Sequence, residues 1–343
     1  MSGFGFIPDG DGADRENFEA MMRQMQEQIK AQFEQMGMSG INFTNLNLAG
    51  LIPGFGSTEV LPANTVRETA RKFISAQGSQ PVGTSDLTAV NNACEIADIW
   101  LNEATVFPAI SQSTTHQAAI SRLDWVDATS AGWLLTMEPL AQGLTDAIGR
   151  LLDQAMRDQE SFGEGASQGQ PPIAPIAALL KSFIGGMIAT QLGQAIGAVA
   201  AQSTGAHDVA LPLLDPARPL LIPENIERWG ADTEIPKTEV YIFHALRESA
   251  IARLFAHNPW IVSYIRSAII EYGRGIHIDL DAITRQAEEA MNGAVEQSFT
   301  IALDKGIFTP EETPAQREAL TKLETVLALV DGWAAVSYTH LRA

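Results

Sequence analysis

Apolar residues recur every three or four positions along most of the chain, which is the spacing of one face of an α-helix. The stretch 239–260, with the sequence EVYIFHALRESAIARLFAHNPW, shows this pattern clearly. Its apolar face consists of Val240, Phe243, Leu246, Ala250 and Leu254. The neighbouring stripe carries His244, Arg247, Glu248 and Ile251. The pattern predicts a helix that packs by one face and presents candidate catalytic side chains on the next.

The same periodicity predicts helices along the rest of the chain. They cover residues 14–38, 62–77, 85–105, 121–158, 260–276, 283–306 and 313–336. Within 121–158 we expect a short helix and a longer one, with Pro139 marking a start or a kink. The proline-rich stretch 210–230 predicts a short strand beside the helix at 239–257. The predicted fold is therefore mainly α: a multi-helix domain with at most a few short strands.

The organisation of the chain follows from two breaks in this pattern. Residues 1–61 predict a flexible tail that carries one amphipathic helix, because residues 1–13 are rich in glycine and aspartate and several glycines with Pro53 follow residues 14–38. The polar run 161–172, SFGEGASQGQPP, separates a predicted helical subdomain at 62–160 from a second one at 173–336.

The last predicted helix has a capping box at its start. Thr313 is the N-cap, Pro314 is the first helical residue, and Gln316 supplies the third-position amide. The final residues 337–343, SYTHLRA, have no periodicity, and we expect them to be a non-native tail without a functional role.

The apolar run 173–202 is long enough to span a bilayer. It contains Lys181, Gln191, Gln194 and the pair Gly185–Gly186, and each of these features is unfavourable in a membrane helix. We therefore predict no membrane span and, instead, a buried hairpin of two small-residue helices.

The net charge and the cysteine content limit the partners and the chemistry that the chain can have. The formal net charge of −19 repels phosphate backbones, so nucleic acid is excluded as a partner. The one cysteine, Cys94, lies on an apolar helical stripe, which predicts a buried thiol without a redox or metal role. The amino terminus lacks the features of a signal peptide, so a cytoplasmic location is expected. The oligomeric state stays open.

The stripe beside the apolar face of 239–260 suggests metal chemistry. In the motif H-E-x-x-H, two histidines one turn apart bind zinc and the glutamate activates the bound water. Here Glu248 occupies the glutamate position. Phosphate-binding glycine loops, nucleophile elbows and dinucleotide fingerprints do not occur in the sequence.

Several blocks, in this order, resemble the bacterial family of zincin-like metallopeptidases type 2 over about residues 62–336. The blocks are ADIWLNEAT (97–105), LDWVDAT (123–129), ATQLGQAIGAVA (189–200), ALRESAIARLFAHNPW (245–260), YGRGI (272–276) and LETVLALVDGW (323–333). The resemblance implies a zincin-like domain, zinc as cofactor and a peptide or protein substrate that is hydrolysed by a zinc-dependent mechanism.

The resemblance also assigns individual positions. Glu248 falls on the general base, Ile251 on a metal-binding histidine, Arg247 on the variable first-histidine position, and Asp331 on a downstream acidic position. Isoleucine offers no metal ligand, so the resemblance implies an enzyme whose zinc chemistry is impaired in this chain. The alternative is a non-catalytic binding or scaffold protein that keeps the zincin-like fold.

A replacement set of ligands is also conceivable from the sequence. His244 lies one turn before Glu248, and both would meet Asp331 if the two helices face one cleft. Glu324 and His257 are the neighbouring candidates. The simpler alternatives are an ordinary buried histidine, an ion pair of Arg247 with Glu248 or Asp331, and a helix-terminal role for His257. If the assignment is right, Ile251→His should restore zinc binding.

Overall fold

The computed structural model describes residues 59–110, 118–162, 173–276 and 313–339. Within these ranges it contains eight helices and no strand. The helices are α3 (Ala63–Gln77), α4 (Thr84–Ala104), α5 (Arg122–Phe162), α6 (Ile173–Ala200), α7 (Pro223–Gly230), α8 (Lys237–His257), α9 (Pro259–Arg274) and α12 (Pro314–Thr339). The predicted mainly α fold is confirmed. The predicted helices at 14–38 and 283–306 lie outside the described residues.

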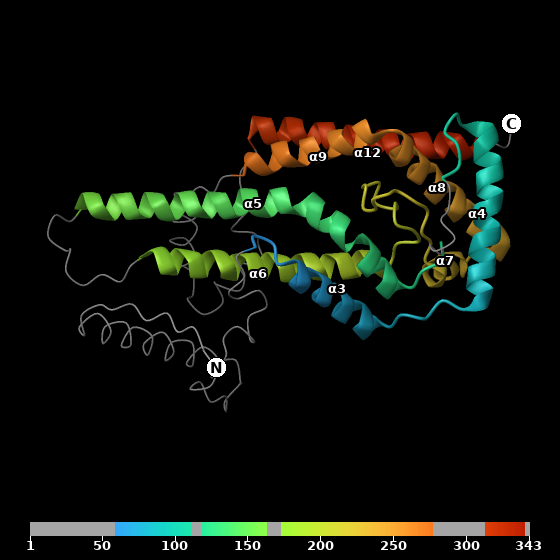
Figure 1. Ribbon diagram of the computed structural model, residues 1–343, viewed down its shortest axis with the longest axis horizontal. Helices are drawn as coiled ribbons and strands as arrows, with labels where there is room; N and C mark the ends of the chain where they lie inside the picture. The colour runs from blue at the N-terminus through green and yellow to red at the C-terminus, as the bar shows by residue number, and fades with distance from the viewer. Residues whose placement is uncertain (1–58, 111–117, 163–172, 277–312, 340–343) are drawn as a thin grey trace, which may run out of the picture.

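The helices enclose two hydrophobic cores. One core lies among α4, α8, α9 and α12, and the other lies among α3, α5 and α6. In Figure 1, α5 and α6 run side by side, and α9 lies along α12. Because α9 also packs against α5, it joins the two groups of helices. Each core combines helices from both sides of residues 161–172.

Cys94 is buried in the first core, as predicted, and burial raises the pKa of its thiol to about 12.

The predicted hairpin at 173–202 is wrong, because these residues form the single helix α6 as far as Ala200. The pair Gly185–Gly186 continues the helix instead of breaking it. Glycine allows close contact with α3: a Cβ at Gly193 would lie 2.6 Å from the carbonyl oxygen of Val66. Among the described helices, none is both long and apolar enough to cross a bilayer.

The expected division of 121–158 into two helices is also wrong. α5 is continuous, with Pro139 inside it. The stretch after this proline is where α9 crosses α5 most closely, since a Cβ at Gly143 would lie 2.1 Å from the carbonyl oxygen of Gly273. The two backbones touch at this crossing, so both glycines are needed for the two groups of helices to meet.

The start of α12 confirms the predicted capping box. The backbone N–H of Gln316 donates to Thr313 Oγ1 at 3.1 Å, and the backbone N–H of Thr313 donates to Gln316 Oε1 at 3.0 Å. The helix continues through Ser337–Thr339.

Three extended segments beside α8 carry the only β-like pairing in the described ranges. Leu221 forms isolated bridges with Ala119 and with Gly205, parallel and antiparallel respectively. The stretch 210–230 thus contributes extended backbone next to α8, although no full strand forms. These segments place the backbone around residues 204–207 and 220 directly against the candidate site.

Candidate functional site

The helix α8 is buried over most of its surface. It packs against α4, α7, α9 and α12, and the extended segments cover part of the remainder (Figure 1). Its residues are apolar on more than one face, which is the composition of a helix inside a core. The polar side chains buried with it are His244, Glu248, Ser249 and Arg253. Each buried polar group needs hydrogen-bond partners, and these partners define the site.

Glu248 lies at the centre of the site and is only 2% exposed. Its Oε1 accepts hydrogen bonds from the backbone N–H groups of Ala206 and Leu220, both at 3.1 Å, and from Nδ1 of His207 at 2.8 Å. Its Oε2 accepts from the backbone N–H of His207 at 3.0 Å. A carboxylate has about four lone-pair sites, so these four donors, three of them on Oε1, occupy most of its acceptor capacity. The carboxylate thereby ties α8 to two extended segments.

Gly205 is the residue that lets the backbone reach this carboxylate. A Cβ at this position would lie 2.3 Å from Glu248 Oε2, which is closer than atoms can approach. The carbonyl oxygen of Gly205 accepts a hydrogen bond from Trp125 Nε1 at 3.0 Å, so α5 holds the same segment from the other side. The loop and the glutamate therefore fit together only because residue 205 has no side chain.

His244, one turn before Glu248, takes part in a second hydrogen-bond chain. Thr204 Oγ1 lies 2.8 Å from Asp208 Oδ2 and 2.9 Å from His244 Nδ1. Because a carboxylate accepts and a hydroxyl has one hydrogen, Thr204 donates to Asp208 and accepts from His244 Nδ1–H. The Nε2 atom is then unprotonated in the neutral ring, and it is buried without a partner among the described residues. The rings of Trp229 and His244 are perpendicular, and their centroids are 4.9 Å apart.

Burial lowers the pKa of His244 from 6.5 to about 4, against the weaker opposing influence of Asp208. The unfolded chain therefore binds this proton at a higher pH than the folded chain. The stability that depends on a neutral His244 is fully present above pH 6.5 and is lost as the pH falls towards 4. We expect His244 to account for about 2–3 kcal/mol of the stability lost between pH 7 and 4.5.

Urea unfolding of the wild type and of His244→Asn at these two pH values measures this contribution. Asparagine keeps a donor near the position of Nδ1 but does not titrate, so the variant should lose correspondingly less stability on acidification. Equal losses in the two proteins would show that burial of a neutral His244 is not the cause.

Arg247 connects three parts of the chain by ion pairs. Its guanidinium lies 2.9 Å from Asp208 Oδ1 and 2.7 Å from Asp331 Oδ1. It also donates to the carbonyl oxygen of Asp208 at 3.3 Å. Asp208 follows the loop that binds Glu248, and Asp331 lies on α12. A cation thus holds two acidic groups together next to Glu248, and the predicted contact between Arg247 and Asp331 is present.

The other predicted site residues lie at separate places. Ile251 is fully buried in the core among α4, α8, α9 and α12. His257 Nε2 donates to the carbonyl oxygen of Pro108 at 3.1 Å, and its ring stacks on Phe107. It therefore holds the segment after α4 and not the last carbonyls of its own helix. Glu324 is exposed on α12. The structure brings Arg247 and Asp331 together but shows no contact of Glu324 or His257 with Glu248 among the described residues.

Zinc, which the family resemblance implies, does not fit the side chains at this place. Arg247 and Ile251 offer no lone pair to a metal, and the Glu248 carboxylate already binds four N–H donors. In the described part of the chain, no group of three or more His, Cys, Asp and Glu side chains is placed to hold a metal ion. Two buried imidazole nitrogens, Nε2 of His207 and Nε2 of His244, have no partner there.

His207 and Asp208 belong to the candidate site but are not predicted from the sequence. They lie about 40 positions before their partners on α8, in a loop without helical spacing. The sequence contains no motif that pairs them with Glu248 and Arg247. The one available signal is the order Gly205-Ala206-His207-Asp208, a small-residue turn followed by two ionisable side chains directly after a long apolar helix.

The chain was also compared with known proteins. The model of the zincin-like metallopeptidase family matches residues 63–341, which is most of the chain. No match was found among curated proteins or among solved structures. The matched region includes α8, α12 and the extended segments at 204–208 and 220, and therefore all the residues of the candidate site. The chain belongs to the zincin-like metallopeptidase family.

Proposed function

We propose that this chain keeps the scaffold of a zincin-like metallopeptidase as a binding protein and does not hydrolyse peptides. The observation that carries the proposal is the environment of Glu248. A general base must reach the water that it activates, but this carboxylate is buried and accepts four hydrogen bonds from its own chain. Glu248 is therefore a structural anchor for the loop at 204–208.

The ion pairs of Arg247 support the same proposal. The family's first ligand position and its downstream acidic position, occupied here by Arg247 and Asp331, are joined directly through a guanidinium. A guanidinium stays protonated at any physiological pH and binds carboxylates through several N–H donors. It balances the charges of Asp208 and Asp331, and it links α8 to α12.

Zinc-dependent peptide hydrolysis, the activity that the family name implies, is the second candidate function. The observation that favours it is the pair of unpartnered nitrogens on His207 and His244, because neutral imidazole nitrogen is a good zinc ligand. His207 is moreover oriented by a carboxylate through Nδ1, which is how metal-binding histidines are commonly held.

Hydrolysis of a complex peptide mixture separates the two candidates. The full chain is purified without chelator, supplied with zinc, and incubated with a proteolytic digest of casein, and new peptides are counted by mass spectrometry. We expect no products beyond those formed with added EDTA. Zinc-dependent products that disappear in His207→Asn or His244→Asn would overturn the proposal. A peptide-type ligand and a cytoplasmic location remain parts of the proposal.

A further inference from the structure

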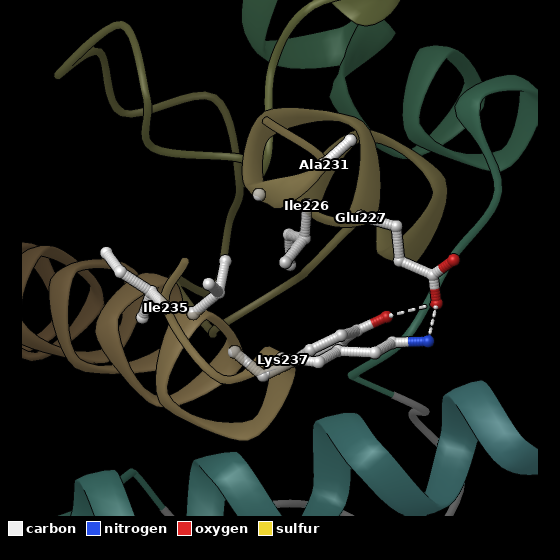
Figure 2. Close-up of a pocket in the computed structure, with 8 residues that line it drawn as sticks. Ile226, Glu227, Ala231, Ile235 and Lys237 are labelled. Carbon is white, nitrogen blue, oxygen red and sulfur yellow. Dashed lines mark hydrogen bonds and ion pairs between the residues drawn. The ribbon is translucent and has the colours of Figure 1, made fainter. Parts of the chain in front are cut away.

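A pocket of about 240 Å³ opens between α7 and the start of α8 (Figure 2). Its lining residues are Ile226, Glu227, Gly230, Ala231, Ile235, Lys237, Val240 and Tyr241. The pocket lies about two helical turns before Glu248 on α8 and shares no lining residue with the site described above. It is thus a separate feature of the surface.

The floor of the pocket is apolar and buried, whereas its rim is open to solvent. Ile226 and Val240 are buried in the core, and Ile235 on the rim is 48% exposed. Apolar surface continues outside the pocket, where Trp229 stacks on Phe243 with ring centroids 5.9 Å apart. Both of these aromatic side chains are exposed. Exposed aromatic and aliphatic side chains next to a pocket are typical of the anchor points of protein interfaces.

One carboxylate stands at the mouth of the pocket. Glu227 Oε1 forms an ion pair with Lys237 Nζ at 2.5 Å and accepts a hydrogen bond from the hydroxyl of Tyr241 at 3.2 Å (Figure 2). Glu227 Oε2 has no partner among the described residues, and the side chain is 42% exposed. This oxygen is available to a cation or an N–H donor from outside.

The surrounding surface is acidic. The connection between α7 and α8 exposes Asp232 and Glu234, and Glu239 is exposed in the first turn of α8. None of the three forms an ion pair with another described residue. Arg228 of α7 donates to the carbonyl oxygen of Ala201 and to Asn225 Oδ1, and it does not line the pocket. The segment 227–239, which lines and borders the pocket, therefore carries four acidic side chains against two basic ones.

We propose that this pocket docks a basic segment of a partner protein, which inserts one aliphatic side chain between α7 and α8. A flanking lysine or arginine of the partner binds Glu227 Oε2, and further basic side chains lie near Asp232, Glu234 and Glu239. The inference rests on the proposed function, because a binding protein holds this segment without cleaving it. It deepens that proposal by naming the chemistry of the partner.

The size and charge of the pocket select this occupant. Its volume is below the range of about 300–1,000 Å³ that is usual for cofactors and drug-sized ligands, but it holds one side chain. A second copy of this chain carries the same net charge of −19 and would bring like charges together. A basic partner is attracted by the same charges, so its binding should weaken as salt is added.

Binding of short labelled peptides to the full chain tests the inference. The probe is a blocked peptide with the sequence Gly-Lys-Leu-Lys-Gly, and fluorescence anisotropy measures its affinity at low and at physiological salt. The matched peptides are Gly-Glu-Leu-Glu-Gly and Gly-Lys-Ser-Lys-Gly. We expect the lysine–leucine peptide to bind at least about fivefold more tightly than either of them, which is a modest difference for one apolar or charged contact.

Two variants locate the binding. Ile235→Ser removes the apolar rim and should weaken binding about fivefold or more, whereas Leu329→Ser removes an equally exposed side chain on α12 and should leave it unchanged. Glu227→Gln should reduce the dependence of the affinity on salt.

Mass spectrometry of the recovered peptide separates the two proposals. A cleaved peptide contradicts the proposed function, whereas an intact peptide that does not bind, or that binds Ile235→Ser as well as the wild type, overturns the docking inference alone.

Discussion

Replacing Glu248 with alanine should lower the free energy of unfolding by about 3–5 kcal/mol, the usual cost of removing one partner from a buried charged network. Four N–H donors lose their acceptor: the backbone N–H groups of Ala206, Leu220 and His207, and Nδ1–H of His207. Water cannot easily replace the carboxylate, because Glu248 and His207 are almost fully buried. Urea unfolding followed by circular dichroism measures the change.

Two further substitutions make this prediction specific. Glu248→Gln keeps the size of the side chain but turns one oxygen into a donor that faces other donors, so it should be destabilising by a smaller amount, about 2 kcal/mol. Glu324→Ala removes an exposed glutamate of α12 and should change the stability by less than about 0.5 kcal/mol. If Glu248→Ala is as mild as Glu324→Ala, the carboxylate is not a structural anchor.

The combination Arg247→His, Ile251→His and Asp331→Glu should give the chain a zinc site with a dissociation constant of about 1 µM or lower, equivalent to about 8 kcal/mol. Two histidines one turn apart on α8 then present nitrogen to the same side, and the longer glutamate of α12 reaches further towards them. Removal of Arg247 also releases Asp331 from its ion pair. Isothermal titration with zinc measures the affinity.

Ile251→His alone should bind zinc at least about a hundredfold more weakly than the combination, because the Arg247 guanidinium remains between Asp208 and Asp331. The structure thus changes the expectation from the sequence that this single substitution suffices. A single variant that binds as tightly as the combination would show that Arg247 moves aside at little cost and does not take the place of a metal.

Several helix boundaries are predictable from the sequence because prolines and one capping box mark them. The end of α8 at His257 follows from Asn258-Pro259, and the start of α12 follows from the capping box at Thr313. The hairpin predicted within α6 fails for a physical reason. A glycine pair breaks an isolated helix, but here small residues such as Gly193 allow close packing against α3, and this packing stabilises a continuous helix.

The candidate site is less predictable, since its contacts join distant parts of the chain. The sequence indicates that Glu248 and Arg247 lie together on one helix, and the family resemblance predicts that Ile251 occupies a ligand position. It does not indicate that His207 and Asp208 bind these side chains, because a loop without periodicity has no preferred partner until the fold positions it. The role of Glu248 as an acceptor for this loop depends on those long-range contacts.

The zinc content of the wild-type chain tests the central proposal most directly. The protein is expressed with zinc in the medium, purified without chelator, and analysed by mass spectrometry for metal and by amino-acid analysis for protein. We predict well under about 0.1 zinc per chain and no change in the thermal unfolding midpoint after EDTA, because the side chains around Glu248 bind each other and leave no set of three ligands. One zinc per chain, lost together with stability when EDTA is added, would contradict the proposal.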